Sequence, residues 1–129
     1  MLDCIAEVAR RHELTIGVVG HAGDGNLHPT ILADKRDAAE MARVNAGIDE
    51  LFADALRLGG TLSGEHGIGT AKLRYLPWEI GDVGMDVTAR IKHAFDPRNL
   101  LNPGKVVPLA GSTRRAAGAA RAPGAEPAR

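Results

Sequence analysis

Aromatic residues and cysteine are scarce in this sequence of 129 residues. Its only Phe, Tyr and Trp residues are Phe52, Phe95, Tyr75 and Trp78, so a folded core has to be small and mainly aliphatic. Cys4 is the single cysteine, which excludes an internal disulfide and fits a reducing compartment. These shortages predict a small domain whose stability, taken alone, is marginal.

Long apolar runs and one-sided charge are also missing. No apolar segment approaches the ~20 residues of a membrane-spanning helix, and the N-terminus lacks the apolar core of a signal peptide. Basic and acidic residues balance at a net charge of 0, with no basic stripe interleaved with aromatic rings, so nucleic-acid binding has little support. The expectation is a soluble, cytoplasmic protein without a membrane span.

Apolar periodicity predicts an α+β fold, with a short antiparallel strand pair packed against about three to four helices. The first helix is expected over residues 1–14. The strands are expected over residues 14–20 and 27–32, and Pro29 restricts the second to an edge of the sheet.

A long helix is expected to begin at Asp37, which with Glu40 resembles a capping box. Its apolar stripe continues to the glycine pair Gly59 and Gly60, which is typical of a helix end. A glycine-rich loop follows, then a short connection holding Trp78, and a last helix over residues 84–94. One domain is therefore predicted over residues 1–107. Residues 108–129, rich in Ala, Gly, Pro and Arg, are predicted to be disordered.

The stretch GHAGDGNLHP places two histidines on either side of a turn signal, Asp24-Gly25. If these two residues are the centre of a two-residue hairpin turn, His21 lies directly opposite His28, with Cβ atoms about 4.5–5.5 Å apart. That arrangement would suit two imidazoles sharing one metal ion. Ordinary histidines beside a tight turn are an equally good interpretation of the pair alone.

The loop TLSGEHGIG offers Glu65 and His66 side by side. Glu65 would complete a His₂Glu set with an open coordination position, and His66 would serve as a general base beside the metal. Lys72 and Arg74 follow the loop and would bind a substrate carboxylate. The alternative is a solvated loop in which these charges have no role.

Three motifs in order, GHAGDGNLHP, GGTLSGEHGIGTAK and AFDPRNLLNPGKV, resemble the C-terminal part of the FAD-linked oxidases. That family includes the glycolate oxidase flavoprotein subunit, D-lactate dehydrogenases and D-2-hydroxyglutarate dehydrogenase. The resemblance covers about residues 1–107 and implies the C-terminal portion of the family's substrate domain. Thr30, after Pro29, looks more like the glycolate and lactate branch than the hydroxyglutarate branch.

The resemblance implies roles for the residues already singled out. His21, His28 and Glu65 would bind a divalent metal, zinc or manganese, and His66 would take the proton of a 2-hydroxy acid while hydride passes to FAD. Asn26 and Asn102 would lie near the flavin or the substrate.

The family's FAD-binding domain has no counterpart in these 129 residues. The chain is therefore expected to be a fragment that is inactive alone, with a separate flavin-binding domain or subunit as its partner. A standalone divalent-metal-binding module and a non-functional truncated remnant are the alternatives.

Overall fold

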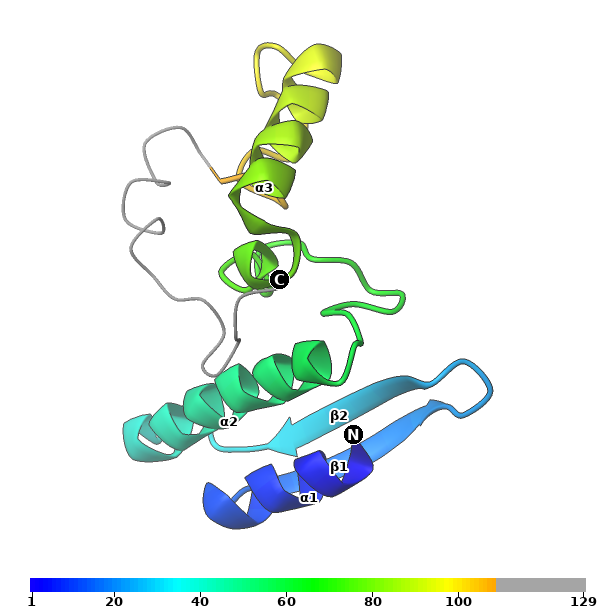
Figure 1. The fold of residues 1–129 in the computed structure, drawn as a ribbon. Coiled ribbons are helices and arrows are strands. Elements are labelled where there is room, and N and C mark those ends of the chain that lie inside the picture. Colours follow the sequence, from blue (N-terminus) through cyan, green and yellow to red (C-terminus); the bar gives the residue numbers. More distant parts are fainter. Residues whose placement is uncertain (109–129) are drawn as a thin grey trace. The chain divides into compact units, whose positions relative to one another are not determined.

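The structure is a computed structural model that describes residues 1–108. Over this range the chain forms a helix, two strands and two further helices (Figure 1). Its contacts divide it into two units, Met1–Gly60 and a second unit that begins at Thr61. The predicted α+β fold with one antiparallel strand pair is confirmed, with three helices in the described residues. The disorder predicted for residues 108–129 concerns residues that, apart from Pro108, lie outside the described range.

The first unit packs two helices, α1 (Leu2–Arg11) and α2 (Ala38–Arg57), with a β-hairpin. Its core consists of Ile5 and Val8 from α1 and Leu51 from α2. Four partly buried apolar residues surround this cluster: Met1, Ile16, Val18 and Leu27. The core is wholly aliphatic apart from the Met1 sulfur, as the shortage of aromatic residues predicts.

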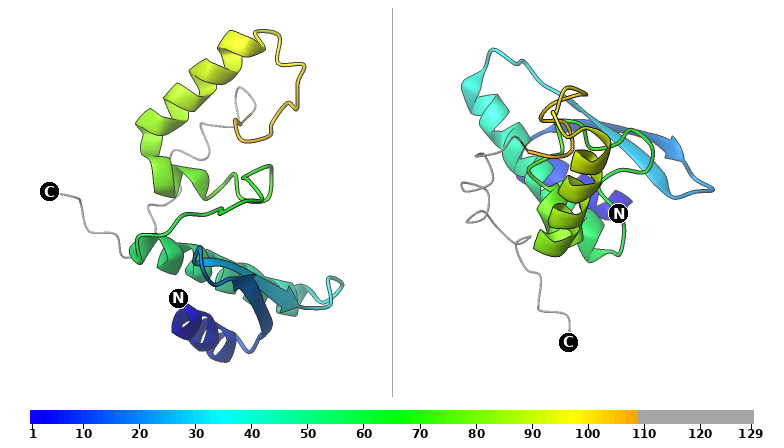
Figure 2. Two further views of the ribbon diagram at one scale, coloured as in Figure 1. Left: turned by 90° about the vertical axis from the view of Figure 1, so that its right-hand side faces the viewer. Right: turned by 90° about the horizontal axis from the view of Figure 1, so that it is seen from above.

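The hairpin joins β1 (Thr15–His21) to β2 (Asn26–Leu32) in antiparallel register. Because side chains alternate between the two faces of a strand, Ile16 and Val18 point to the core while His21 and His28 lie on the opposite face. The tip of the hairpin projects past the two helices of this unit (Figures 1 and 2). Pro29 pairs with Val18 and is tolerated because both strands of a two-stranded sheet are edge strands.

Helix α2 begins and ends as its sequence predicts. The Asp37 side chain accepts hydrogen bonds from the backbone N–H groups of Ala39 and Glu40, at 2.8 and 3.0 Å. The Glu40 carboxylate accepts from the Asp34 N–H and not from the Asp37 N–H of a standard capping box. At the other end the N–H groups of Gly59 and Gly60 donate to Leu56 and Ala55, the bonding pattern of a Schellman motif.

The second unit begins with an irregular segment and continues into α3 (Leu76–Phe95). The prediction of a short connection around Trp78 and a helix from residue 84 is wrong, because the helix begins eight residues earlier, at Leu76. Pro77 is accommodated because the first turn of a helix does not need its N–H group. A kink at Gly81, whose φ is 64°, separates the first turns of α3 from its longer remainder. The apolar periodicity is interrupted there, which explains why it did not reveal the first turns.

Asp96 ends α3 and organises the segment that follows. Its carboxylate accepts the backbone N–H groups of Leu100 and Leu101, at 2.9 and 2.8 Å, and pairs with the Lys92 ammonium. A turn follows, in which the Lys105 N–H donates to the Asn102 carbonyl. No helix within residues 1–108 is long and apolar enough to cross a membrane.

Candidate functional site

The connection between β1 and β2 contains four residues, Ala22 to Gly25. The Asp24 N–H donates to the His21 carbonyl at 3.0 Å, so Ala22 and Gly23 are the central residues of the turn. Gly25 follows with a φ of 67°. The predicted two-residue turn centred on Asp24 and Gly25 is therefore wrong. An Asp-Gly pair signals a residue with positive φ, but hairpin loops of several lengths need such a residue, so the pair alone does not fix the register.

The register places His21 opposite Asn26 and His28 opposite Val19. The predicted direct pairing of the histidines is thus wrong by two residues. Because the error is an even number, both histidines remain on one face of the sheet as diagonal neighbours. Their ring centroids lie 5.4 Å apart and the rings are nearly perpendicular, at 88°.

This separation of the imidazoles is compatible with a shared metal ion. A zinc–nitrogen bond is about 2.0–2.1 Å long, so two imidazoles bound tetrahedrally to one ion have ring centroids about 5 Å apart. The His21–His28 distance of 5.4 Å is close to that value. Imidazole nitrogen also suits the borderline character of zinc. The hairpin can therefore supply two ligands of a metal site.

Gly20 allows the close approach of the strands next to the histidines. A Cβ atom at this position would lie 2.5 Å from the backbone oxygen of Asn26, well inside van der Waals contact. The backbone of β2 cannot give way without a change in the pairing that sets the His21 position. Glycine at residue 20 is therefore required by the hairpin geometry.

Glu65 and His66 lie in the irregular segment of the second unit. The His66 Nε2 is 3.7 Å from a Glu65 carboxylate oxygen, and the two side chains are 73% and 45% exposed. Both side chains are therefore accessible to a ligand. The predicted base and the predicted carboxylate ligand are thus adjacent, accessible side chains of this unit.

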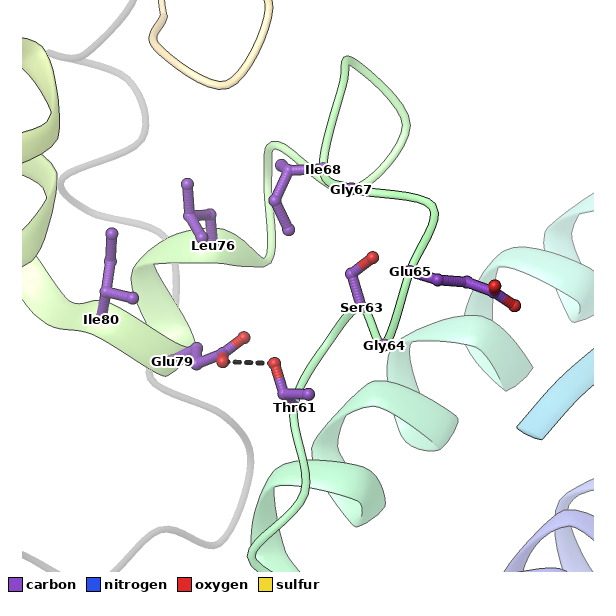
Figure 3. A pocket seen from close by; sticks show the side chains of 9 residues that line it. All are labelled: Thr61, Ser63, Gly64, Glu65, Gly67, Ile68, Leu76, Glu79 and Ile80. Carbon is purple, nitrogen blue, oxygen red and sulfur yellow. Dashed lines mark hydrogen bonds between the residues drawn. The ribbon is translucent and has the colours of Figure 1, made fainter. Parts of the chain in front are cut away.

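A shallow groove of about 360 Å³ lies between this loop and the first turns of α3 (Figure 3). Thr61 and Glu79 point toward one another across it, with Thr61 Oγ1 donating to the Glu79 carboxylate at 2.5 Å. The Glu65 side chain points away from the α3 residues (Figure 3). Glu79 was not singled out in the sequence. The only signal for it is that acidic residues favour the first turn of a helix.

The two predicted carboxylate-binding cations both make contacts inside the second unit. The Lys72 ammonium donates to the Leu62 carbonyl at 2.8 Å. Arg74 donates to the Tyr75 hydroxyl and its guanidinium lies 4.6 Å from the centroid of that ring.

The two predicted flavin-proximal amides occupy turns or their borders. Asn26 is the first residue of β2, directly opposite His21, and Asn102 opens the turn closed by Lys105. Each therefore has a backbone position fixed by pairing or by a hydrogen bond.

Comparison with known proteins assigns the chain to a family. Residues 1–106 match the model of the FAD linked oxidases, C-terminal domain. The glycolate oxidase subunit GlcD of Bacillus subtilis is 47% identical over 106 residues, which are 82% of this chain and 23% of that protein. A probable mitochondrial D-lactate dehydrogenase of Danio rerio is 43% identical over 98 residues, covering 76% of this chain and 20% of the relative.

The GlcD subunit of Escherichia coli K12 is 38% identical over 108 residues, or 84% of this chain and 22% of that protein. The chain thus spans between a fifth and a quarter of the length of these relatives. The three motifs of the sequence predicted this kinship, and the matches confirm it: the chain belongs to the FAD linked oxidase family, in the part that forms its C-terminal domain.

Proposed function

We propose that this chain is the metal- and substrate-binding C-terminal part of an FAD-dependent 2-hydroxy acid dehydrogenase. The reaction would convert glycolate or D-lactate to the 2-oxo acid. The observation that carries the proposal is the His21–His28 pair, set at a metal-compatible distance in a chain of the FAD linked oxidase family. The printed names of its relatives, glycolate oxidase and D-lactate dehydrogenase, favour these two substrates.

The metal would be zinc or manganese, bound by the two histidine nitrogens and a Glu65 oxygen. Three protein ligands leave at least one coordination position for a substrate, which is the arrangement of catalytic metal sites. The bound ion would polarise the hydroxyl and carboxylate oxygens of the substrate. His21 and His28 would act through their placement on regular β-structure, because ligands on paired strands are fixed more closely than ligands on loops.

His66 would accept the proton of the substrate 2-hydroxyl as the C2–H bond breaks. Its place beside Glu65 would put base and metal ligand on adjacent residues. FAD would supply the acceptor for the hydride, with most of its contacts made by other parts of the family's proteins. Asn26 and Asn102 would donate or accept hydrogen bonds near the flavin or the substrate.

Lys72 and Arg74 would bind the substrate carboxylate through charge-assisted hydrogen bonds. An ammonium has three N–H donors and a guanidinium has five. One donor of Lys72 is used by Leu62 and at least one of Arg74 by Tyr75. A guanidinium presents its donors in a planar fork that matches a carboxylate, so Arg74 would make the bidentate contact.

Zinc titration of the purified chain tests the metal site. We expect one zinc ion per chain in a calorimetric titration, and loss of this binding in His28→Ala, because two ligands cannot hold the ion as three do. His93→Ala is the matched control, since it removes an exposed histidine of α3. Equal loss in both variants, or no zinc binding by a folded chain, would contradict the proposed site.

Turnover tests the proposed base. Residues 1–106 would replace the matching part of the Bacillus subtilis GlcD subunit, and oxidation of glycolate and D-lactate would be followed with an artificial electron acceptor. We expect His66→Ala to lower kcat by roughly 10²–10⁴-fold, the usual contribution of a general base. Undiminished turnover would exclude His66 as the base. A chain that binds zinc but never supports turnover would be a standalone metal-binding module.

A further inference from the structure

Leu62 is held at three points although it lies in a segment without regular structure. Its side chain is only 3% exposed. Its N–H donates to the second carboxylate oxygen of Glu79 at 3.1 Å, and its carbonyl accepts from the Lys72 ammonium at 2.8 Å. We call Leu62 with these two charged partners the Leu62 anchor. Both backbone groups of one residue are thus satisfied by ions of opposite sign, and such charge-assisted hydrogen bonds are stronger than neutral ones.

The Glu79 carboxylate uses both of its oxygens in this contact. One accepts the Thr61 hydroxyl at 2.5 Å (Figure 3), and the other accepts the Leu62 N–H at 3.1 Å. Two successive residues of the loop are therefore attached to the first turn of α3. A carboxylate with both oxygens engaged has a fixed orientation, which makes Glu79 a rigid support for the chain at Thr61 and Leu62.

The far end of the same loop is also fixed. The Lys72 N–H donates to the Ile68 carbonyl at 3.2 Å, and the Val106 N–H donates to the Gly69 carbonyl at 3.0 Å. Glu65 lies three residues after Leu62 and three residues before Ile68. Fixing both ends of so short a loop reduces the backbone freedom that Glu65 would otherwise lose on binding a ligand.

We infer that Glu79 is a positioning residue for Glu65 and His66, acting through the Leu62 anchor. Lys72 contributes to the same anchor from the opposite side. The inference rests on the proposed function, because it concerns the loop that carries the proposed metal ligand and base. Glu79 touches neither metal nor substrate in this scheme, and its effect passes through the backbone of residues 61–64.

Zinc affinity of the full chain tests the inference. Groups that orient metal ligands typically contribute 10–100-fold to metal affinity, and we expect Glu79→Ala to weaken zinc binding by roughly this factor. Glu79→Gln keeps an oxygen acceptor for the Leu62 N–H and should restore most of the affinity. Asp86→Ala is the matched control, since it removes an acid of the same helix whose partner is Arg90, and should leave the affinity unchanged.

A double-mutant cycle separates positioning from a general loss of structure. If Glu79 acts only through Glu65, then Glu79→Ala should cause no further loss of zinc affinity in a Glu65→Gln background. If the zinc affinity of the double variant falls by the product of the two single-variant factors, the inference is overturned. If Glu79→Ala does not fold, Thr61→Val removes one of the anchoring hydrogen bonds without a change of shape and should give a smaller, equally coupled loss.

Backbone relaxation by NMR tests the anchor without metal. Amide order parameters of residues 63–67 should fall below about 0.6 in Glu79→Ala, the range of flexible backbone, and stay unchanged in Asp86→Ala. Unaltered order parameters would overturn the inference whatever the zinc titration shows. Zinc binding that survives both His28→Ala and Glu65→Gln would reject the proposed function alone, and the relaxation result would still decide the role of Glu79.

Discussion

Different kinds of interaction stabilise the interior of each of the two units of this chain. In residues 1–60 an aliphatic cluster of Ile5, Val8 and Leu51 lies between two helices and one face of a hairpin. In the second unit, the turns and loops are fixed by charged side chains that bind backbone groups: Glu79 and Lys72 around Leu62, and Asp96 after α3.

This difference determines how each part of the candidate site is positioned. His21 and His28 lie on two paired strands, and the backbone pairing of these strands sets their relative placement. Glu65 and His66 lie in a loop whose first end is fixed by the Glu79 side chain and whose far end is fixed by backbone hydrogen bonds. Substitution of a single side chain should therefore loosen the loop and spare the hairpin, whereas the hairpin should respond mainly to changes that disturb its backbone.

The apolar surface differs as well. Ile5 and Val8 on α1 are at most 3% exposed, whereas Val83 and Phe95 on α3 are 79% and 83% exposed. The buried apolar residues of the second unit lie before α3 or at its first residue: Leu62, Tyr75 and Leu76. Burial of apolar area stabilises a fold by about 25 cal/mol per Å², and the exposed residues of α3 contribute little of this kind. The polar contacts of the second unit are correspondingly more important for its order.

Alanine at residue 20 should have the largest effect on the hairpin. The added methyl group would lie 2.5 Å from the Asn26 carbonyl oxygen, and overpacking of this kind typically costs about 1–3 kcal/mol. The strands must separate, so the His21–His28 distance changes with them. We expect a lower urea midpoint for Gly20→Ala, together with shifted resonances of both histidine rings.

Gly17→Ala provides the comparison for that variant. Gly17 lies on the same strand, and a Cβ atom there would meet no atom within 4 Å. The substitution should leave the midpoint nearly unchanged or raise it slightly, since alanine restricts the unfolded chain. Equal effects of the two substitutions on the midpoint would mean that the hairpin depends less on its backbone spacing than the close contact at Gly20 implies.

The hairpin shows how far sequence reasoning reached and where it stopped. Each end of the two strands was predicted to within one residue, because β-branched residues and the Asp-Gly signal are local properties. The register was missed, since it depends on loop length and on packing against α1. The common face of His21 and His28 survived this error because a shift by two residues preserves the alternation of side chains.

The second unit was less predictable for a physical reason. The helix around Trp78 was missed, because a proline and a kink at Gly81 interrupt the periodic pattern from which helices are predicted. The Leu62 anchor was missed as well, because it joins residues 10 and 17 positions apart through side chain to backbone contacts that leave no periodic signal. Glu65 and His66 could be singled out as candidates because adjacent chemical groups are visible in the sequence itself.

The second unit should also respond specifically to acid. The Lys92 ammonium, with the N–H groups of Leu100 and Leu101, lowers the pKa of Asp96 from 3.8 to about 2. Because the folded pKa is below the unfolded one, the contribution of Asp96 to stability is complete above about pH 4 and disappears as the pH falls through about 2. Trp78 is the only tryptophan and packs against Tyr75 at a ring distance of 5.0 Å, so its fluorescence reports on this unit alone.

Urea titrations followed by Trp78 fluorescence should therefore show a midpoint that falls between about pH 4 and pH 2. In Asp96→Asn the midpoint should be lower at neutral pH and should lack the part of the acid dependence that Asp96 supplies, since asparagine has no proton to bind. An identical acid dependence in both proteins would mean that the contacts of Asp96 do not hold the end of α3. The contrast between a unit held by packing and a unit held by charge would then fail at the buried carboxylate where it is expected to be clearest.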